Sequence, residues 1–501
     1  MKFLYQNYTG AFLLWCNSFV SGKLFLMKTA FQKQPGSVKI VLLMLLVLVT
    51  GCSTFLPEKS PATLTPSPIP ITPSHQPQPT ATITPEIPIE YRVEINDLRG
   101  SEILFLHPFV GAIDEQYQAW AEEFNQKNPY GITIKVESTG GLDTLPSMIQ
   151  SRNPQVILTT PELLSQGLEE GWLAALDGYL TLPELGLSEA EQKNIHEEFW
   201  LQDRFSGAQS GFPALRTAIG LIYNTTWANE LGYTHPPSTP QEFLEQACAA
   251  ARENNRSAYL DKRGTGGWLL STDSLHAIAW WYAFGAKVLP EKPGEKIQFE
   301  QNSVATTFQF LRDMQSQGCL WQGLNPSPYR YFSERYTLFY IGSLQDIPPQ
   351  QAYHQSLARK DDWTLIPFPR QNQEPFFLSH GFSYGLLRTK PKLQMAGWLW
   401  IRWLADPSRQ STLTRLYQGM PLGNSSQNVF FDPILEKHFM HDASLIPLPG
   451  NPDWLIARRP VEDAFWQIFH LAEGQSVEEV MVELQSLTEY ELSRTQATPI
   501  P

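Results

Sequence analysis

Residues 219–243 of this chain read IGLIYNTTWANELGYTHPPSTPQEF. The second half of this stretch predicts that a helix starts directly after Thr239. Pro240 falls in the first turn, where the backbone needs no N–H donor. Glu242 falls in the same turn, where the helix dipole favours an acidic side chain. The stretch therefore joins an apolar run, a proline-rich turn and a helix in short succession.

Upstream of this stretch, two kinds of apolar segment alternate. Short apolar runs are each followed by a segment with the helical spacing of three and four, as in Tyr117, Trp120 and Phe124. This alternation predicts an α/β protein with a largely parallel sheet. The expected strands are Glu102–Leu106, Ile132–Glu137 and Gln155–Leu158, and the expected helices are Ile113–Lys127, Leu145–Ser151 and Pro161–Glu170.

The residues that directly follow these strands are candidates for ligand contact. In open α/β sheets, ligands bind at the carboxyl ends of the strands. His107 and Phe109 follow the first expected strand, Gly141 follows the second and Thr160 follows the third. We expect these four residues to lie near a ligand site.

The stretch at 219–243 resembles the extracellular solute-binding proteins of family 1, the maltose- and oligosaccharide-binding components of ABC importers. The shared pattern is a strand ending in Tyr223-Asn224, a short helix, and Pro-Pro-x-Thr before a helix that contains Glu242. Arg335 departs from the family pattern, which usually has Gly there. Further segments resemble the family in the same order between roughly Arg99 and Glu489, namely 119–129, 332–343, 363–369, 396–410, 419–423 and 465–484.

This resemblance implies the two-lobe fold of class II periplasmic binding proteins, with a ligand cleft between α/β lobes joined by hinge strands. It places the crossings near 212–220 and 376–386. The folded part is expected at 91–501. Its first lobe would comprise about 91–215 and 380–450, and its second lobe about 220–375 and 455–490.

The resemblance also implies a function. Such a protein binds a small solute, here expected to be a sugar or a related compound, closes around it, and delivers it to the permease subunits of an ABC importer. We expect no enzymatic activity, cofactor or metal, and we assume a monomer because the sequence gives no sign of self-association. The net charge of −13 independently argues against nucleic acid as a partner, since phosphate backbones attract basic surfaces.

Aromatic faces with a few polar groups suit a sugar, so tryptophans in loops and polar residues near the crossings are further candidates. Trp268 follows a glycine-rich run and is the first choice. Leu344 stands where the maltose-binding relatives have a stacking Trp, which argues against a maltodextrin ligand. Arg216 has an equally good alternative as one half of a hinge salt bridge. The remaining candidates are Ser343, His380, Tyr384 and Trp466.

Two other classes of function have sequence features in their favour. Gly381-Phe382-Ser383-Tyr384-Gly385 matches the nucleophile elbow of hydrolases, which requires a strand before the serine and a helix directly after it. His438, His441 and Asp442 are candidate metal ligands, although the sequence shows no further strong ligand to complete a site with them. A receptor for a non-sugar solute, such as a polyamine, a metal chelate or a peptide, is the third alternative, because the acidic charge suits cations.

The N-terminal region predicts export and a lipid anchor. Lys28, Lys33 and Lys39 precede a run of ten apolar residues at 40–49, which is too short to span a bilayer and is typical of a secretory signal. Val49-Thr50-Gly51-Cys52 resembles the lipobox of bacterial lipoproteins, which implies cleavage before Cys52 and lipidation of that cysteine. We therefore expect residues 1–51 to be a signal peptide, with Met27 as an alternative start, and the protein to be anchored on the outer face of the bacterial cytoplasmic membrane.

A tether is expected between the anchor and the folded part. From Pro57 to Glu90, ten of 34 residues are Pro and six are Thr, so residues 52–90 cannot build a core. A glycosylated or cell-wall stalk is the alternative. After Cys52 only Cys248 and Cys319 remain, and they either form one disulfide or stay as two buried thiols.

Overall fold

The computed structural model describes residues 91, 93–290, 295–324, 327–358, 360–423, 433–440 and 443–496. The expected signal peptide, the lipidation site Cys52 and the proline-rich tether lie outside these residues, as do His441 and Asp442. Among the described residues, no helix combines the length and apolar character needed to cross a membrane.

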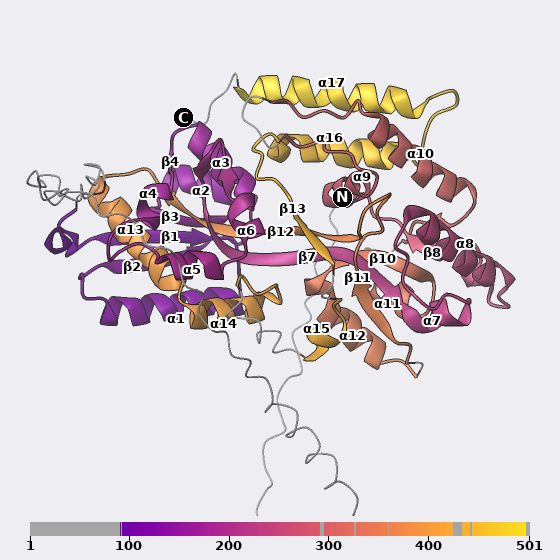
Figure 1. The fold of residues 1–501 in the computed structure, drawn as a ribbon, viewed down its shortest axis with the longest axis horizontal. Coiled ribbons are helices and arrows are strands. Elements are labelled where there is room, and N and C mark those ends of the chain that lie inside the picture. Colours follow the sequence, from indigo (N-terminus) through magenta and orange to yellow (C-terminus); the bar gives the residue numbers. More distant parts are fainter. Residues whose placement is uncertain are drawn as a thin grey trace, which may run out of the picture. The chain divides into compact units, whose positions relative to one another are not determined.

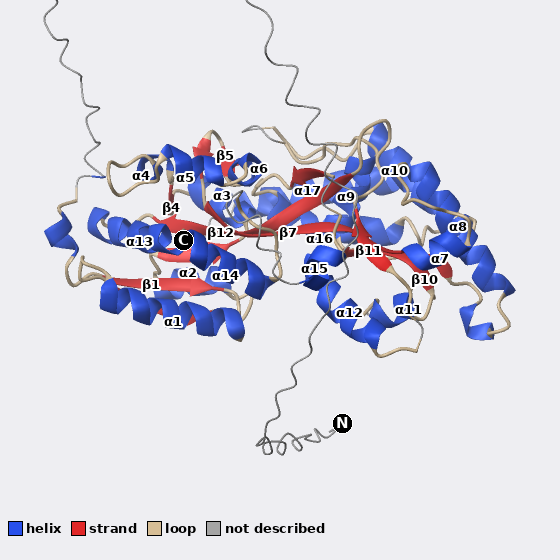
Figure 2. Ribbon diagram, turned by 60° about the horizontal axis from the view of Figure 1, so that its bottom comes forward, coloured by secondary structure: helices blue, strands red, loops and turns tan. Residues whose placement is uncertain are grey.

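Eleven of the described strands form one continuous sheet (Figures 1 and 2). The main path runs in the order β2-β1-β3-β12-β7-β10-β8-β9, while β4 and β13 pair with β12 and β11 pairs with β7. A separate two-stranded hairpin consists of β5 and β6. Helices cover both faces of the main sheet (Figure 2), as expected for an α/β fold. The strands are β1 (Glu102–His107), β2 (Thr133–Ser138), β3 (Val156–Thr159), β4 (Leu173–Ala174), β5 (Arg204–Phe205), β6 (Ala208–Gln209), β7 (Phe212–Asn224), β8 (Gly266–Leu269), β9 (Leu320–Trp321), β10 (Thr337–Ser343), β11 (Trp363–Ile366), β12 (Phe376–Leu387) and β13 (Ser444–Pro447).

The first lobe is built on the parallel strands β2, β1 and β3. Its core contains the apolar stripe of α1, including Tyr117, Trp120 and Phe124, which confirms the helix predicted from their spacing. Trp398 and Trp400 of α13 pack in the same core. The helices of this lobe are α1 (Ala112–Lys127), α2 (Leu145–Arg152), α3 (Pro161–Glu169), α4 (Asp177–Leu180), α5 (Glu189–Asn194), α6 (Glu197–Gln202), α13 (Pro391–Leu404) and α14 (Pro407–Tyr417).

The second lobe surrounds β10, β8 and β9 and has its own core, which contains Trp280 and Trp281 of α9. Thr239 caps α8 through its side chain, and Pro240 is the first residue of that helix, as predicted. Cys248 of α8 forms a disulfide with Cys319 beside β9, with 4.5 Å between their Cα atoms. The helices here are α7 (Thr225–Glu230), α8 (Pro240–Arg256), α9 (Ser274–Ala283), α10 (Asn302–Ser316), α11 (Tyr329–Ser333), α12 (Ile347–Gln355), α15 (Pro433–Lys437), α16 (Trp454–Gln467) and α17 (Val477–Gln496).

Two long strands, β7 and β12, run through both lobes (Figure 1). Residues 212–217 of β7 pair antiparallel with β12, whereas residues 219–224 pair with β10 and β11 of the second lobe. Residues 383–386 of β12 pair with β3 of the first lobe. Every residue of β7 is buried, so the connection between the lobes is part of the core. These strands lie where the crossings were expected.

The lobe boundaries within this fold stay a prediction. Two elements from the segment expected in the first lobe, α15 and β13, contact the second lobe, and β13 also contacts α6 of the first lobe. Leu435 of α15 packs in a cluster with Phe332 and Tyr340, and Leu445 of β13 packs against the same cluster. The C-terminal helices α16 and α17 pack on each other and on α9 and α10, and α16 also contacts α3 of the first lobe.

Candidate functional site

A cleft of about 800 Å³ is bounded by both lobes and by β12. This volume lies within the range of about 300–1,000 Å³ that is usual for small-molecule sites. The first lobe contributes Leu142, Thr160 and Glu162, and β12 contributes His380. The second lobe contributes the start of α9 and one side of α16 and α17. Its lining residues are Asp273, Ser274, Leu275, Trp454, Leu455, Ile456, Arg458, Arg459, Pro460, Glu462, Asp463, Leu487 and Glu491.

The wall from the first lobe is the turn from β3 into α3. β3 ends at Thr159, and Pro161 begins α3, because proline fits the first helical position. Glu162 follows in the first turn, where the helix dipole favours a negative charge. The Glu162 side chain is only 2% exposed, and its Oε1 atom is buried without a hydrogen-bond partner in the described structure. This wall therefore presents a carboxyl group whose acceptor capacity is unused.

The wall from the second lobe carries polar side chains around an indole. Asp273 caps α9 by accepting a hydrogen bond from the Leu275 N–H at 2.8 Å. The Ser274 hydroxyl donates to Glu462 Oε1 at 3.0 Å and so fixes that carboxylate between α9 and α16. Trp454, which begins α16, is 4% exposed and packs into the core behind the cleft. The wall is thus polar at its surface and apolar directly behind.

His380 lies at the junction of the two walls, on β12. It pairs with Thr217 of β7, and its ring is partly exposed. Burial lowers the pKa of His380 below its usual value, as do Arg216 and Arg458, while Glu162 and Asp273 oppose that change. The charges that act on the pKa of His380 therefore come from both walls of the cleft and from the hinge.

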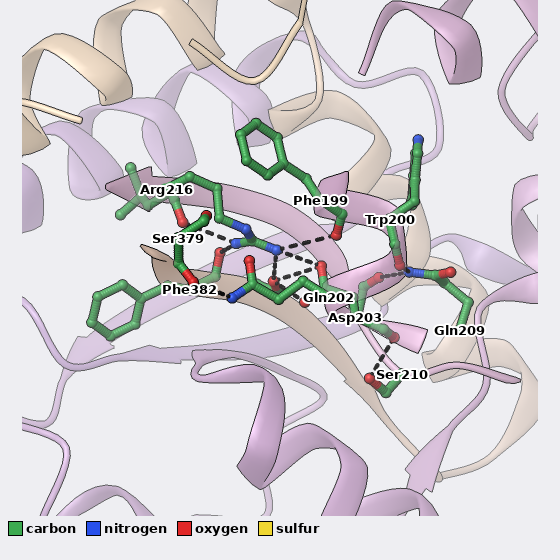
Figure 3. A network of polar contacts seen from close by, with 12 residues as sticks. Phe199, Trp200, Gln202, Asp203, Gln209, Ser210, Arg216, Ser379 and Phe382 are labelled. Carbon is green, nitrogen blue, oxygen red and sulfur yellow. Dashed lines mark hydrogen bonds and ion pairs between the residues drawn. The ribbon is translucent and has the colours of Figure 1, made fainter. Parts of the chain in front are cut away.

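A buried polar network adjoins the cleft within the hinge (Figure 3). The Arg216 guanidinium pairs with Asp203, with 2.8 Å between Nη2 and Oδ2, and it also donates to the Phe382 carbonyl at 2.6 Å. The Ser383 hydroxyl donates to Asp203 at 2.7 Å. All three side chains are buried. Arg216 thus forms the hinge salt bridge that was the alternative to ligand contact.

An aromatic group lies on the hinge between α14 and the loop after β1. The Phe109 ring packs edge-on against Phe382 and Tyr417, with centroids 4.9 and 5.8 Å away. Gln345 of the second lobe accepts a hydrogen bond from the Thr217 hydroxyl at 2.6 Å and donates to the Tyr417 carbonyl at 3.1 Å. Phe109 is half-buried in this group and does not line the cleft.

The structure corrects the interpretation of Ser383 as a nucleophile. A nucleophile elbow needs a sharp turn from strand to helix at the serine. Ser383 instead lies inside β12, paired with Thr159 and Pro213, and the strand continues to Leu387. Its hydroxyl is bonded to a carboxylate rather than to a histidine. The sequence match therefore does not form the geometry of a hydrolase.

Of the ten predicted ligand residues, Thr160 and His380 line the cleft, and Gly141 immediately precedes the lining residue Leu142. Three others belong to the lobe cores. Trp268 is fully buried against Phe243 and Trp280. The Tyr384 hydroxyl lies 2.9 Å from that of Tyr117. Their burial corrects the expectation that they face a ligand.

His107 is the third predicted residue that lies in a core. It is fully buried, with its Nε2 atom 3.3 Å from Asp114 Oδ1. Burial lowers its pKa to about 4, and Asp114 opposes this change.

The last two predicted residues have local roles. The Ser343 hydroxyl donates to Asp346 Oδ2 at 2.8 Å in a capping box at the end of β10. Trp466 is 48% exposed and stacks on His470, away from the cleft. His438, considered for metal binding, is bonded through Nδ1 to the Trp363 carbonyl at 2.7 Å and stacks on that indole.

Sequence reasoning missed most of the second-lobe wall and Glu162. Glu162 follows the predicted residue Thr160 by two positions, so the rule on strand ends, extended into the helix, would have included it. No comparable signal marks Trp454, Arg458 or Glu462. These residues lie far from the others in sequence, and only the packing of α16 across α9 and α3 brings them to the cleft.

Comparison with known proteins gives a consistent family and fold. The family model described as "Bacterial extracellular solute-binding protein" matches residues 119–435. The sugar-binding protein MalE from Xanthomonas citri superposes with a TM-score of 0.63 at 16% identity, covering 79% of this chain and 99% of that protein. The cyclic α-maltosyl-1,6-maltose binding protein from Arthrobacter globiformis gives 0.62 at 14% identity, with coverage of 78% and 99%. A solute binding protein from Thermotoga lettingae gives 0.58 at 17%, with coverage of 78% and 100%. These likenesses show the class II two-lobe fold.

Proposed function

We propose, from the premise that this chain belongs to the bacterial extracellular solute-binding proteins, that its cleft binds a sugar or a related polyhydroxy solute. The observation that carries this proposal is the cleft itself, which is bounded by both lobes and by β12 and is lined by hydroxyl and charged groups from both walls, with His380 among them. Hydroxyl-rich solutes need polar groups that approach them from several sides, and this cleft provides such groups on both walls.

The similar solved structures support a carbohydrate as the solute class. Two of them are named for maltodextrin-type or other sugars, and the Thermotoga protein was crystallised with α-D-tagatose. Leu344 at the position of a stacking tryptophan still argues against a maltodextrin for this chain. A shorter or differently substituted sugar fits the proposal better.

Ligand binding would favour closure of the two lobes. A ligand can shift such an equilibrium only by contacts that are better in the closed state. Thr160 and Glu162 approach the cleft from the first lobe, and Asp273 and Glu462 approach it from the second. A solute that bonds to both walls at once gains most when the walls approach each other. The closed form of the protein would therefore signal that a solute is bound.

Delivery to an ABC permease and lipid anchoring complete the proposal. The support for anchoring is the sequence Val49-Thr50-Gly51-Cys52 after a short apolar run, followed by the proline-rich segment to Glu90. A lipid on Cys52 would keep a monomeric receptor near its membrane partner and so raise the effective concentration. Labelling of cells with a fatty-acid analogue tests this point, since Cys52→Ser should abolish incorporation.

A thermal-shift screen of mono- and oligosaccharides on the purified protein tests the binding function. At a ligand concentration of about 1,000 times Kd, binding stabilises a protein by about 4 kcal/mol, which gives a clear rise in Tm. His380→Asn should weaken the binding of any solute that shifts Tm, because it alters the junction of both walls. His235→Asn is the matched control, since His235 is exposed and does not line the cleft. If no solute of any class raises Tm, the receptor function is wrong.

A further inference from the structure

Three buried ionisable groups lie in the cleft wall or in the adjoining hinge, and two of them are carboxyl groups. Asp203 and Glu162 are both buried carboxyl groups, whereas Arg216 is the buried cation beside them. Arg216 is already paired with Asp203 at 2.8 Å. Burial is the main cause that raises the pKa of Asp203, and the charge of Glu162 adds to the increase, which places Glu162 near the pair. Of the two carboxyl groups, Glu162 is therefore the one that lines the cleft and forms no ion pair with a described residue.

The Glu162 carboxyl group differs from that of a surface acid because its burial keeps it from being hydrated by bulk water. Its side chain is 2% exposed, and Oε1 accepts no hydrogen bond from any described residue. A buried acceptor without a donor is costly, and more so when the group is charged. Each such group in a native structure calls for an explanation, and at a cleft wall one explanation is a donor from a bound solute. Glu162 lines the cleft, so a bound solute lies on the side from which that donor would come.

The other charged residues that line the cleft are also mostly acidic. Four further carboxyl groups line it, and two guanidinium groups oppose them. Arg458 and Arg459 are exposed, so water and salt screen them, in contrast to the buried Glu162. Because acids lie on both walls, closure around an empty cleft would bring like charges together. The four acids are Asp273, Glu462, Asp463 and Glu491.

We propose that the solute carries a protonated amine, as in an amino sugar or an aminocyclitol, and that Glu162 accepts its hydrogen bond. This inference rests on the proposed binding function and names the class of solute within it. A cation between the walls would neutralise the excess carboxylate and relieve the repulsion that opposes closure, which links recognition to the closed state. A neutral sugar could fill the unused acceptor but would leave the excess charge.

Matched pairs of neutral and amino ligands test the proposal by calorimetry and thermal shift. The pairs are glucose with glucosamine, and cellobiose with its diamino counterpart, the disaccharide of glucosamine. The N-acetylated form of that disaccharide has the same skeleton with amides in place of the ammonium groups. We expect an amino member to bind at least about tenfold more tightly than its neutral partners at a pH below the amine pKa, since charge-assisted bonds exceed neutral ones by that amount.

A single substitution then tests whether the Glu162 carboxylate causes the preference for amino ligands. Glu162→Gln keeps the size and an acceptor oxygen but removes the charge, so it should abolish most of the amine preference and alter neutral-sugar binding much less. Glu169→Gln is the matched control, because Glu169 is an exposed acid at the other end of α3 and does not line the cleft. Raised salt should weaken any attraction by the exposed acids and leave the effect of Glu162 in place.

The outcomes separate this inference from the binding function. If neutral sugars bind as tightly as their amino partners, or if Glu162→Gln retains the amine preference, the inference is overturned and the receptor function stands. If the amino sugars fail while spermidine binds, the sugar class is wrong. Loss of amine binding in Glu162→Gln with an unchanged fold by circular dichroism supports the proposal. If no solute binds at all, both are wrong.

Discussion

Two polar clusters lie next to each other between the lobes, and they differ in whether their charged groups are paired. In the hinge network, Arg216, Asp203 and Ser383 are buried and bonded to one another. In the cleft, Glu162 is equally buried but its Oε1 has no donor. Buried charges that are paired fix a structure even where one atom, here Arg216 Nε, has no hydrogen-bond partner, whereas a buried carboxyl group without an ion pair leaves an interaction that a ligand can make. The comparison therefore separates residues that hold the lobes together from residues that recognise the solute.

The largest expected effect is the loss of the hinge salt bridge. Asp203→Asn leaves the Arg216 guanidinium buried without a counter-charge, which should lower the free energy of unfolding by about 3–5 kcal/mol. Urea unfolding followed by tryptophan fluorescence measures this change. Glu189→Gln, which breaks the exposed pair of Glu189 with Lys193, is the control and should have an effect within about 0.5 kcal/mol. Similar effects of both substitutions would remove the distinction between the hinge network and an ordinary ion pair.

His107 tests an intermediate case, because it is buried beside only one carboxylate. Burial lowers its pKa from 6.5 to about 4, so the unfolded state binds a proton first as the pH falls. The free energy of unfolding should therefore decrease between pH 6.5 and 4, and the part due to His107 amounts to about 3 kcal/mol over the full range. In His107→Gln this part of the pH dependence should be absent, because glutamine does not titrate. Parallel pH profiles of the two proteins would contradict the prediction.

A smaller loss is expected from the serine of the hinge network. Ser383→Ala removes a hydrogen bond of 2.7 Å to the Asp203 carboxylate, which should cost about 1.5–2 kcal/mol of unfolding free energy. Ser147→Ala is the matched control, since the Ser147 hydroxyl donates to the Thr144 carbonyl on an exposed surface. Sugar affinity should hardly change in Ser383→Ala, whereas a protein that used Ser383 as a nucleophile would lose a hydrolytic activity.

The smallest effect, and the only one expected to stabilise the protein, comes from the cleft. Glu162→Gln replaces a buried carboxyl group without a partner by a neutral amide, so the unliganded protein should keep its stability or gain up to about 1 kcal/mol. Thermal unfolding without ligand measures this directly. A large loss of stability would show that Glu162 belongs with the hinge network, and the contrast between the two clusters would fail.

The order of strands and helices was predictable because local periodicity carries it. The stripe of Tyr117, Trp120 and Phe124 predicted α1, and Thr239 with Pro240 predicted the start of α8. The rule that ligands bind at strand ends selected Thr160, which lines the cleft, because that rule depends on topology alone.

Side-chain environments were less predictable because they depend on distant segments. The glycines before Trp268 suggested an exposed loop, but they serve close packing: a Cβ on Gly267 would lie 1.9 Å from the Cys319 carbonyl oxygen. The segment is thus a buried strand, and Trp268 faces the core. The cleft wall formed by α16 depends on how that helix packs across α9 and α3. The local sequence of a helix does not predict which other helices it will cross.

The central position of β12 has a consequence for how the chain reaches its folded state. This strand pairs with β3 and β7, yet it follows β7 by more than 150 residues in the sequence. Until it is synthesised, both neighbours present unpaired edges, which are prone to join other chains. Closing a loop of that length is also entropically slow. During synthesis the first lobe can therefore complete its sheet only after residues 376–387 have appeared, whereas the strands that pair with the second half of β7 are all made before them.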